Sequence, residues 1–150
     1  MDCENSDDFN DCNSIVYGHN MKNGSMFGQL KKFSDNMDAY NRSRYFWIFT
    51  PDADYLYEII SAYTTSVDSE TYTLFKGPGK EFLDYLNKIV SFSDIQTTPG
   101  TLSLNDRIIT LSTCTGNEAT RFVVQGKRVG TNYRNTPTPQ IERLDVSIMQ

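Results

Sequence analysis

The stretch of this sequence that decides the fold is Thr110-Leu111-Ser112-Thr113-Cys114. Residues 106–109 lead into it and predict a β-strand, and residues 115–120 after it predict a loop. Residues 121–124 then begin the next strand. The thiol of Cys114 is therefore expected where one strand ends, and Arg121 where the neighbouring strand begins. A cysteine buried within a strand is an inert small hydrophobe, whereas a cysteine at a strand end can meet a substrate.

Length and composition limit the class of protein. A chain of 150 residues fits one domain, and its nine Tyr, nine Phe and single Trp supply enough large apolar area for a core. The net charge of −5 disfavours binding to a nucleic-acid backbone, so we expect no nucleic-acid partner. No run approaches the roughly 18 apolar residues that cross a bilayer, and the acidic start is unlike a signal peptide. We therefore expect the chain as given to be soluble.

The cysteine count bears on disulfides and metals. Three cysteines leave at least one free thiol, and the chain has them at Cys3, Cys12 and Cys114. Cys3 and Cys12 either pair with each other or are two unpaired surface thiols, and both readings stay open. The spacings match no zinc pattern and the chain has one histidine, so we expect no metal and no cofactor.

The order of elements predicts a mainly β protein, a barrel or part of one with helical insertions. The aromatic run at 44–50, a turn at 51–54 and the run at 55–64 predict a hairpin. A long helix is predicted at 80–92, because apolar side chains recur there at helical spacing, namely Phe82, Leu86 and Ile89 with Leu83 and Val90 beside them. The other expected elements are a strand at 14–17, a short helix at 24–33, a turn or short helix at 34–41, a loop at 66–79, and the strands at 106–114 and 121–129.

Three residue types suit acyl transfer. The single histidine, His19, lies at a strand-to-turn boundary, as do Cys114 and Arg121. A cysteine attacks as the thiolate, which a nearby imidazole favours, and the imidazole can also protonate a leaving amine. An arginine can stabilise the oxyanion that forms on an attacked carbonyl. The alternative is that the histidine is an ordinary turn residue, the cysteine belongs to the core and the arginine is solvated.

Two segments resemble the sortase family. The sequence TLSTC at 110–114, followed by Arg121, resembles the family's TLxTC signature, and YGHNMKNGSMF at 17–27 is similar to the segment that carries its catalytic histidine. The helix at 80–92 before the cysteine strand resembles the extra helix of class B sortases. The resemblance implies a sortase catalytic domain at 1–129. We expect it to be an incomplete sortase-like β-barrel of about five strands, with one long helix before the Cys strand and one or two short helices.

The resemblance also implies a reaction. Sortases are extracytoplasmic cysteine transpeptidases, so the chain is expected to cleave a C-terminal sorting signal of the NPxT-G/N type after Thr and to transfer it to an amine of the cell wall or of a pilin. Cys114 would form the thioester, His19 would act as general acid and then base, and Arg121 would hold the substrate carbonyl and the oxyanion. The expected substrate-binding residues are Ser112, Thr73 and Thr115, the last through a backbone N–H that is a second oxyanion donor.

The sequence also departs from the family's pattern. The chain begins inside the family's domain, so the membrane anchor, the leading helices and the first two or three strands have no counterpart, and we expect an exposed sheet edge. The loop at 115–120 is short for class B. Residues 130–150 extend past the family's usual end and are expected to be linker-like or poorly ordered, or else to form a strand that patches the open edge. The family implies an extracytoplasmic, membrane-anchored location.

Other functions stay open at this point. The chain could be a truncated, catalytically impaired remnant or a module that binds sorting signals without turnover. It could be a secreted cysteine peptidase that uses water as the acceptor. It could also be a structural wall-associated module in which Cys114 is part of the core.

Overall fold

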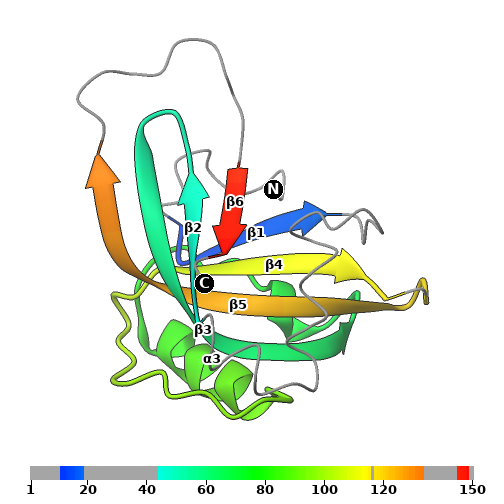
Figure 1. Ribbon diagram of the computed structural model, residues 1–150. Coiled ribbons are helices and arrows are strands. Elements are labelled where there is room, and N and C mark those ends of the chain that lie inside the picture. The colour runs from blue at the N-terminus through cyan, green and yellow to red at the C-terminus, as the bar shows by residue number, and fades with distance from the viewer. Residues whose placement is uncertain (1–10, 19–43, 116, 134–144, 149–150) are drawn as a thin grey trace.

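A single curved sheet organises the part of the chain that the computed structural model describes, which is residues 11–18, 44–115, 117–133 and 145–148. Six strands pair there in the order β1-β4-β5-β3-β2-β6 (Figure 1). They are β1 (Asn13–Gly18), β2 (Tyr45–Phe49), β3 (Ala53–Ser66), β4 (Ile108–Cys114), β5 (Thr120–Tyr133) and β6 (Asp145–Ile148). The described helices are α3 (Lys80–Ser91) and the 3-10 helix η2 (Glu70–Tyr72).

The pairing pattern is that of an incomplete barrel. β1 pairs with β4 in parallel, and the other neighbours pair antiparallel. Within the described residues, β1 and β6 lie at the two ends of the sheet and the sheet does not close on itself. The expectation of a mainly β, incomplete sortase-like barrel is therefore confirmed, with six described strands in place of about five.

The sheet bends because its two longest strands are irregular. β3 and β5 have 14 residues each, and their register shifts between Leu56 and Tyr57 and again between Ile59 and Ser61. Such bulges bend a strand and increase its twist. Gly126 of β5 allows β2 to approach closely, because a Cβ at this position would lie only 2.8 Å from ring carbons of Phe46. The missing side chain leaves room for the β2 ring to lean over β5.

The burial pattern along β3 shows where a second layer begins. In its first half, inward side chains such as Tyr55 and Tyr57 are buried and alternate with half-buried ones. From Ile59 to Tyr63 every residue is buried. A strand that is buried on both faces has layers on both sides. The first half of β3 therefore covers one core, and the second half lies between two.

The second layer is α3, which packs against one face of the sheet (Figure 1). Its inward stripe is Phe82, Tyr85, Leu86 and Ile89, at the spacing of one helix face. These side chains pack on Ile60 and Tyr63 of β3, Ile108 of β4 and Val123 of β5, a cluster that we call the helix-side core. The opposite face carries the barrel-side core, built around Phe46, Tyr57, Leu111 and Phe122.

Most predicted elements in the described residues are present. The hairpin at 44–64 is β2 and β3, although β3 begins at Ala53 and continues to Ser66. The helix at 80–92 is α3, and Leu83 and Val90 are half-buried beside its inward stripe, as predicted. The loop at 66–79 contains η2. The short helix predicted at 24–33 and the turn or short helix at 34–41 lie outside the described residues.

The end of the chain differs from the expected linker wherever it is described. β5 continues to Tyr133, and Asp145–Ile148 forms β6 against the free edge of β2, with Phe46 opposite Ile148. An unpaired strand edge offers a row of backbone donors and acceptors, which explains why a short segment pairs there. The domain boundary at 129 stays a prediction, since residues 134–144 and 149–150 are not described.

Candidate active site

Cys114 and Arg121 are direct partners across the β4–β5 hairpin. Cys114 is the last residue of β4, and its Cα pairs with that of Arg121 in β5. Side chains that are directly opposite in an antiparallel pair lie on the same face of the sheet. The next strand continues the row, because Thr65 of β3 pairs with Arg121. The Cys114 thiol is free and only half-buried, whereas the six residues before it in β4 are buried.

The loop between the two strands holds the Arg121 guanidinium. Its Nη1 donates to the carbonyls of Thr120 at 2.7 Å and Glu118 at 3.1 Å. The Thr115 hydroxyl lies 2.7 Å from the Thr120 hydroxyl and accepts from the Asn117 N–H at 3.2 Å. These bonds tighten the loop at 115–120. They keep the arginine near the strand ends.

Ser112 lies on the same face as Cys114, two residues earlier, and is covered by η2. Its side chain is buried, and its Oγ lies 2.8 Å from the Tyr72 hydroxyl. Burial raises the pKa of Tyr72, while the bond to Ser112 and the positive charge of Arg121 oppose that rise. The Tyr72 ring stacks on Tyr17 of β1, with ring centres 6.1 Å apart. Two tyrosines, Tyr72 and Tyr17, thus lie beside Ser112, two residues before the thiol.

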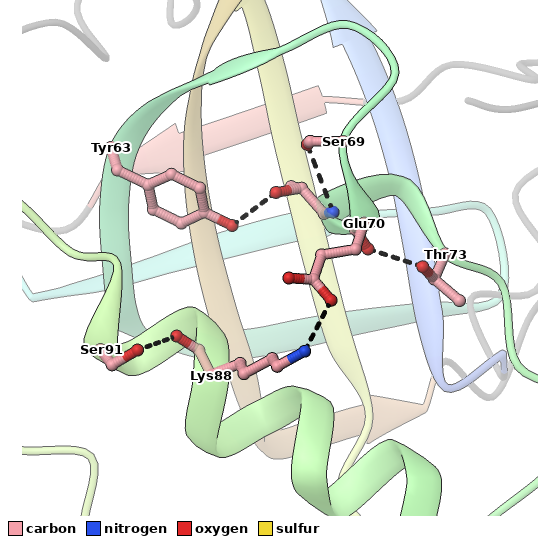
Figure 2. Close-up of polar contacts among 7 residues, drawn as sticks. Tyr63, Ser69, Glu70, Thr73, Lys88 and Ser91 are labelled. Carbon is pink, nitrogen blue, oxygen red and sulfur yellow. Dashed lines mark hydrogen bonds and ion pairs between the residues drawn. The ribbon is translucent and has the colours of Figure 1, made fainter.

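Thr73 follows η2 and lies nearer the start of β4. Its carbonyl accepts from Asn13 Nδ2 at 3.0 Å, and Asn13 Oδ1 in turn accepts from the Thr110 hydroxyl at 2.7 Å. Thr110 precedes Cys114 by four residues, which is about 13 Å along a strand. The exposed Thr73 hydroxyl donates to the Glu70 carbonyl at 2.6 Å (Figure 2). The structure therefore brings Ser112, Thr115, Arg121 and Cys114 together. Thr73 lies further away, beside the part of β4 that contains Thr110.

The position of His19 lies outside the described residues. The residue before it, Gly18, ends β1 and pairs in parallel with Thr113, the residue before Cys114. Cys3 also lies outside the described residues. Cys12 carries a free thiol that is 3% exposed, so the reading of Cys12 as a surface thiol is wrong.

Sequence reasoning missed Tyr72 and Tyr17 as neighbours of Ser112. The signal for Tyr72 is one aromatic residue in a long loop that also contains Leu74 and Phe75, and a sequence separation of 40 residues conceals its contact with Ser112. Tyr17 was assigned to a strand, but its 49% exposure could not be foreseen from an apolar run.

The described ranges contain neither a metal-binding cluster nor a membrane-spanning helix. No three His, Cys, Asp or Glu side chains there are grouped so that they could hold a metal ion. No helix in the same ranges is long and apolar enough to span a bilayer.

Comparison with known proteins identifies the family. The Sortase domain model matches residues 4–129. Sortase B of Listeria monocytogenes is 39% identical over 131 residues, covering 85% of this chain and 52% of that protein. The chain thus spans about half the length of that relative.

Solved structures agree in sequence and in fold. Sortase B from the type II pilus of Streptococcus pneumoniae matches with a TM-score of 0.74 and 31% identity, over 85% of this chain and 73% of that one. Clostridium perfringens sortase B matches with a TM-score of 0.70 and 34% identity, over 80% and 67%. The chain therefore belongs to the sortase family, and it is class B-like.

Proposed function

We propose that this chain carries the catalytic centre of a class B-like cysteine transpeptidase, in which Cys114 is the nucleophile. The observation that supports it most is the β4–β5 register, which sets a free, half-buried thiol directly opposite Arg121. A buried structural cysteine would need neither the exposure nor the cation. Family membership adds the reaction class, since sortases generally are cysteine transpeptidases.

The proposed reaction has two halves that balance. In the first, the Cys114 thiolate attacks the carbonyl carbon of the Thr residue in the sorting signal, and a C–S bond forms. The peptide C–N bond breaks, and the imidazolium of His19 gives its proton to the leaving amine. In the second, an acceptor amine attacks the thioester and gives a proton back to His19. The C–S bond breaks and the Cys114 thiolate is restored.

Two groups are proposed to stabilise the oxyanion of each tetrahedral intermediate. Arg121 supplies the charge, and its bonds to the carbonyls of Glu118 and Thr120 support a fixed position for the guanidinium. The backbone N–H of Thr115, the residue after the nucleophile, is the second donor. Donors that are already in place before the reaction lose nothing to reorganisation, so removing one costs on the order of 10²–10³ in rate.

The proposed role of His19 is supported by its place in the sequence. Gly18 is opposite Thr113, and consecutive Cα atoms are about 3.8 Å apart. His19 is the residue after Gly18 in the sequence, and Gly18 pairs with the residue before Cys114. Together with the family's histidine segment, this supports His19 as the proposed acid and base.

The sorting signal is proposed to lie in extended form along the η2 side of β4. With its scissile carbonyl at Cys114, the residues before it would pass Ser112 and reach the neighbourhood of Thr73. An extended peptide advances about 3.3 Å per residue, so the four residues Asn-Pro-x-Thr span the distance from Cys114 to Thr110. Thr73 is thus a proposed contact for the first residues of the signal. The proposed setting is the cell surface, where sortases generally act.

The test uses a sorting-signal peptide with and without an acceptor amine, and separates products by mass. A transpeptidase yields a new amide whose amount depends on the amine, whereas a water-dependent peptidase yields only the free acid. Because the Streptococcus pneumoniae relative comes from a type II pilus, a lysine side-chain amine is tested beside a glycine peptide.

Variants assign the roles within that test. His19→Ala and Arg121→Ala are each expected to lower kcat/KM by on the order of 10²–10³, and Arg121→Lys to recover little, since a point charge does not reproduce the guanidinium fork. Near-full rate in any of the alanine variants contradicts the role of that residue. Peptide binding without turnover in the unchanged chain would instead identify a sorting-signal-binding module.

A further inference from the structure

Six buried polar side chains form a connected network beneath the η2 turn, which we define as residues 69–73. They come from β1, β3, η2, α3, β4 and β5, and are Asn13, Tyr63, Thr71, Tyr85, Thr110 and Gln125. Each is at most 5% exposed. Polar groups are buried at a cost unless they are paired, so a connected set of six calls for an explanation.

The donor and the acceptor of each hydrogen bond in this network can be assigned from its chemistry. The carbonyls of Thr71 and Thr73 can only accept, so Asn13 must present its NH₂ group to them, at 3.2 and 3.0 Å. Asn13 Oδ1 then faces Thr110, whose hydroxyl must donate its proton at 2.7 Å. The amide orientation of Asn13 is therefore set by the backbone of the η2 turn.

The remaining members follow by the same rule. The Thr110 oxygen accepts from Gln125 Nε2 at 3.0 Å, so Gln125 Oε1 faces the Tyr63 hydroxyl, which donates to it at 2.8 Å. Tyr63 has then used its proton, and the Thr71 hydroxyl donates to it at 2.9 Å. Tyr85 donates to the Thr71 carbonyl and accepts from Gln125 Nε2 at 3.1 Å. Followed from donor to acceptor, these hydrogen bonds end on the backbone carbonyls of Thr71 and Thr73 in the η2 turn.

Outside the network, the η2 turn is attached mainly through side chains: Ser69 accepts from the Thr65 hydroxyl at 2.7 Å, and the Tyr72 ring stacks on Tyr17. Glu70 and Thr73 are exposed, and the Glu70–Lys88 ion pair to α3 spans 3.0 Å between two exposed side chains (Figure 2). Exposed ion pairs contribute little. The Tyr72–Ser112 hydrogen bond holds one side chain. The buried network supplies the side-chain hydrogen bonds to the turn's backbone, from Asn13 and Tyr85 to the carbonyls of Thr71 and Thr73.

We propose that Asn13, Thr110 and Gln125 are positioning residues, which set the height of the η2 turn above Ser112 and so the shape of the sorting-signal groove. This inference rests on the proposed function. The three residues touch neither the thiol nor Arg121 in the strand register, since Gln125 and Thr110 are four residues from Arg121 and Cys114. Changing them is therefore expected to affect peptide binding and to spare the reactivity of the thiol.

The central variant is Thr110→Val, which keeps the size and the β-branch but removes the hydroxyl. It removes the hydroxyl that donates to Asn13 Oδ1 and one of the two acceptors of Gln125 Nε2. Thr110→Ser keeps the hydroxyl and is the rescue. Asn13→Asp is a second variant, because it turns carboxylate oxygens toward the carbonyls of Thr71 and Thr73, and its exposed match is Asn87→Asp in α3. Tyr57→Phe controls for general loss of stability, since its hydroxyl accepts from Arg128 within the barrel-side core.

The first readout is hydrogen exchange of the Tyr72 and Thr73 amides, which bond to the carbonyls of Ser69 and Glu70. Thr110→Val and Asn13→Asp are expected to speed this exchange roughly tenfold or more, because buried groups lose their partners. The second readout is kinetic. KM for the sorting-signal peptide should rise roughly tenfold, while the rate at which a small reagent alkylates Cys114 stays within about twofold. Thr110→Ser, Asn87→Asp and Lys88→Ala should resemble the unchanged chain.

Three results would overturn the inference. One is unchanged amide exchange in Thr110→Val. Another is faster exchange with an unchanged KM, which would make the network a structural feature only. The third is an equal rise of KM in Tyr57→Phe. If the unchanged chain forms no acyl adduct with the peptide, the proposed function fails instead, and the exchange data still decide whether the network holds the turn.

Discussion

Replacing Gly126 by alanine should destabilise the sheet, whereas the same change at Gly130 should not. Both glycines lie in β5, and neither has a positive φ. A Cβ on Gly126 would lie 2.8 Å from Cε1 and Cζ of Phe46 and 3.0 Å from Cβ of Tyr57. A Cβ on Gly130 would meet Leu56 Cβ at 3.5 Å, which is ordinary contact. The two sites therefore differ in packing and share their backbone chemistry.

The size of the difference follows from the packing. Phe46 and Tyr57 are 1% and 0% exposed and stack on each other, so neither ring has room to move away. Overpacking a tight core costs about 1–3 kcal/mol. Replacing Gly by Ala also lowers the entropy of the unfolded chain, which stabilises the folded state by about 0.4–1 kcal/mol at either site. The net expectation is a loss of about 1.5 kcal/mol at Gly126 and a gain of about 0.5 kcal/mol at Gly130.

Urea denaturation measures both changes. With a slope of about 2 kcal/mol per molar, the midpoint should fall by about 0.7 M in Gly126→Ala and rise by about 0.2 M in Gly130→Ala. The slope itself should stay the same. If both variants rise, or if Gly126→Ala is neutral, then Phe46 does not lean over β5 and the reasoning about the sheet's curvature is wrong.

Two further predictions concern buried ionisable groups. Burial is the main cause that raises the pKa values of Tyr57, Tyr63, Tyr72 and Tyr85. The folded chain then keeps protons that the unfolded chain releases near pH 10, so the stability present below pH 10 is lost as the pH rises above it. Urea midpoints that stay constant from about pH 8 to 11 would refute this. Burial likewise raises the pKa of the Cys12 thiol, and Cys12 is 3% exposed. Peptide mapping after brief alkylation should find Cys114 modified and Cys12 protected until the chain unfolds. Equal labelling of the two thiols would contradict the burial of Cys12.

Local patterns were enough to predict several elements from the sequence. The apolar spacing at Phe82, Leu86 and Ile89 requires a helix that packs one face on something, and α3 does so. Apart from Ser112, the run that ends at Cys114 is apolar or β-branched and is bounded by turn residues, and β4 has the same end. Such signals are short-range, so one sequence contains them in full.

Other features depend on contacts between distant parts of the chain. The strand predicted at 55–64 is four residues too short, because pairing with β5 extends β3 from Ala53 to Ser66. β6 forms because β2 has an open edge, not because residues 145–148 have strong strand character. Periodicity gives no information on either pairing.

The candidate site divides in the same way. The Cys114–Arg121 pair follows from a short hairpin, so the sequence placed both residues correctly at the strand ends. The polar network cannot be foreseen, because Asn13 and Thr110 are 97 residues apart and Asn13 lies just outside the strand predicted at 14–17. Tyr72 meets Ser112 across a sequence separation of 40 residues, which no local pattern predicts. The roles of His19, Cys114, Arg121, Ser112, Thr115 and Thr73 stay predictions.

The most direct test of the central claim is the mass of the intact chain after mixing with an Asn-Pro-x-Thr-Gly peptide, followed by addition of a small amine. We expect the mass of the chain to increase by that of the peptide fragment ending in Thr, less one water. This acyl adduct should be absent in Cys114→Ala and should be discharged by the amine. No adduct, in a chain whose Cys114 still reacts with a small thiol reagent, would contradict the assignment of Cys114 as the transpeptidase nucleophile.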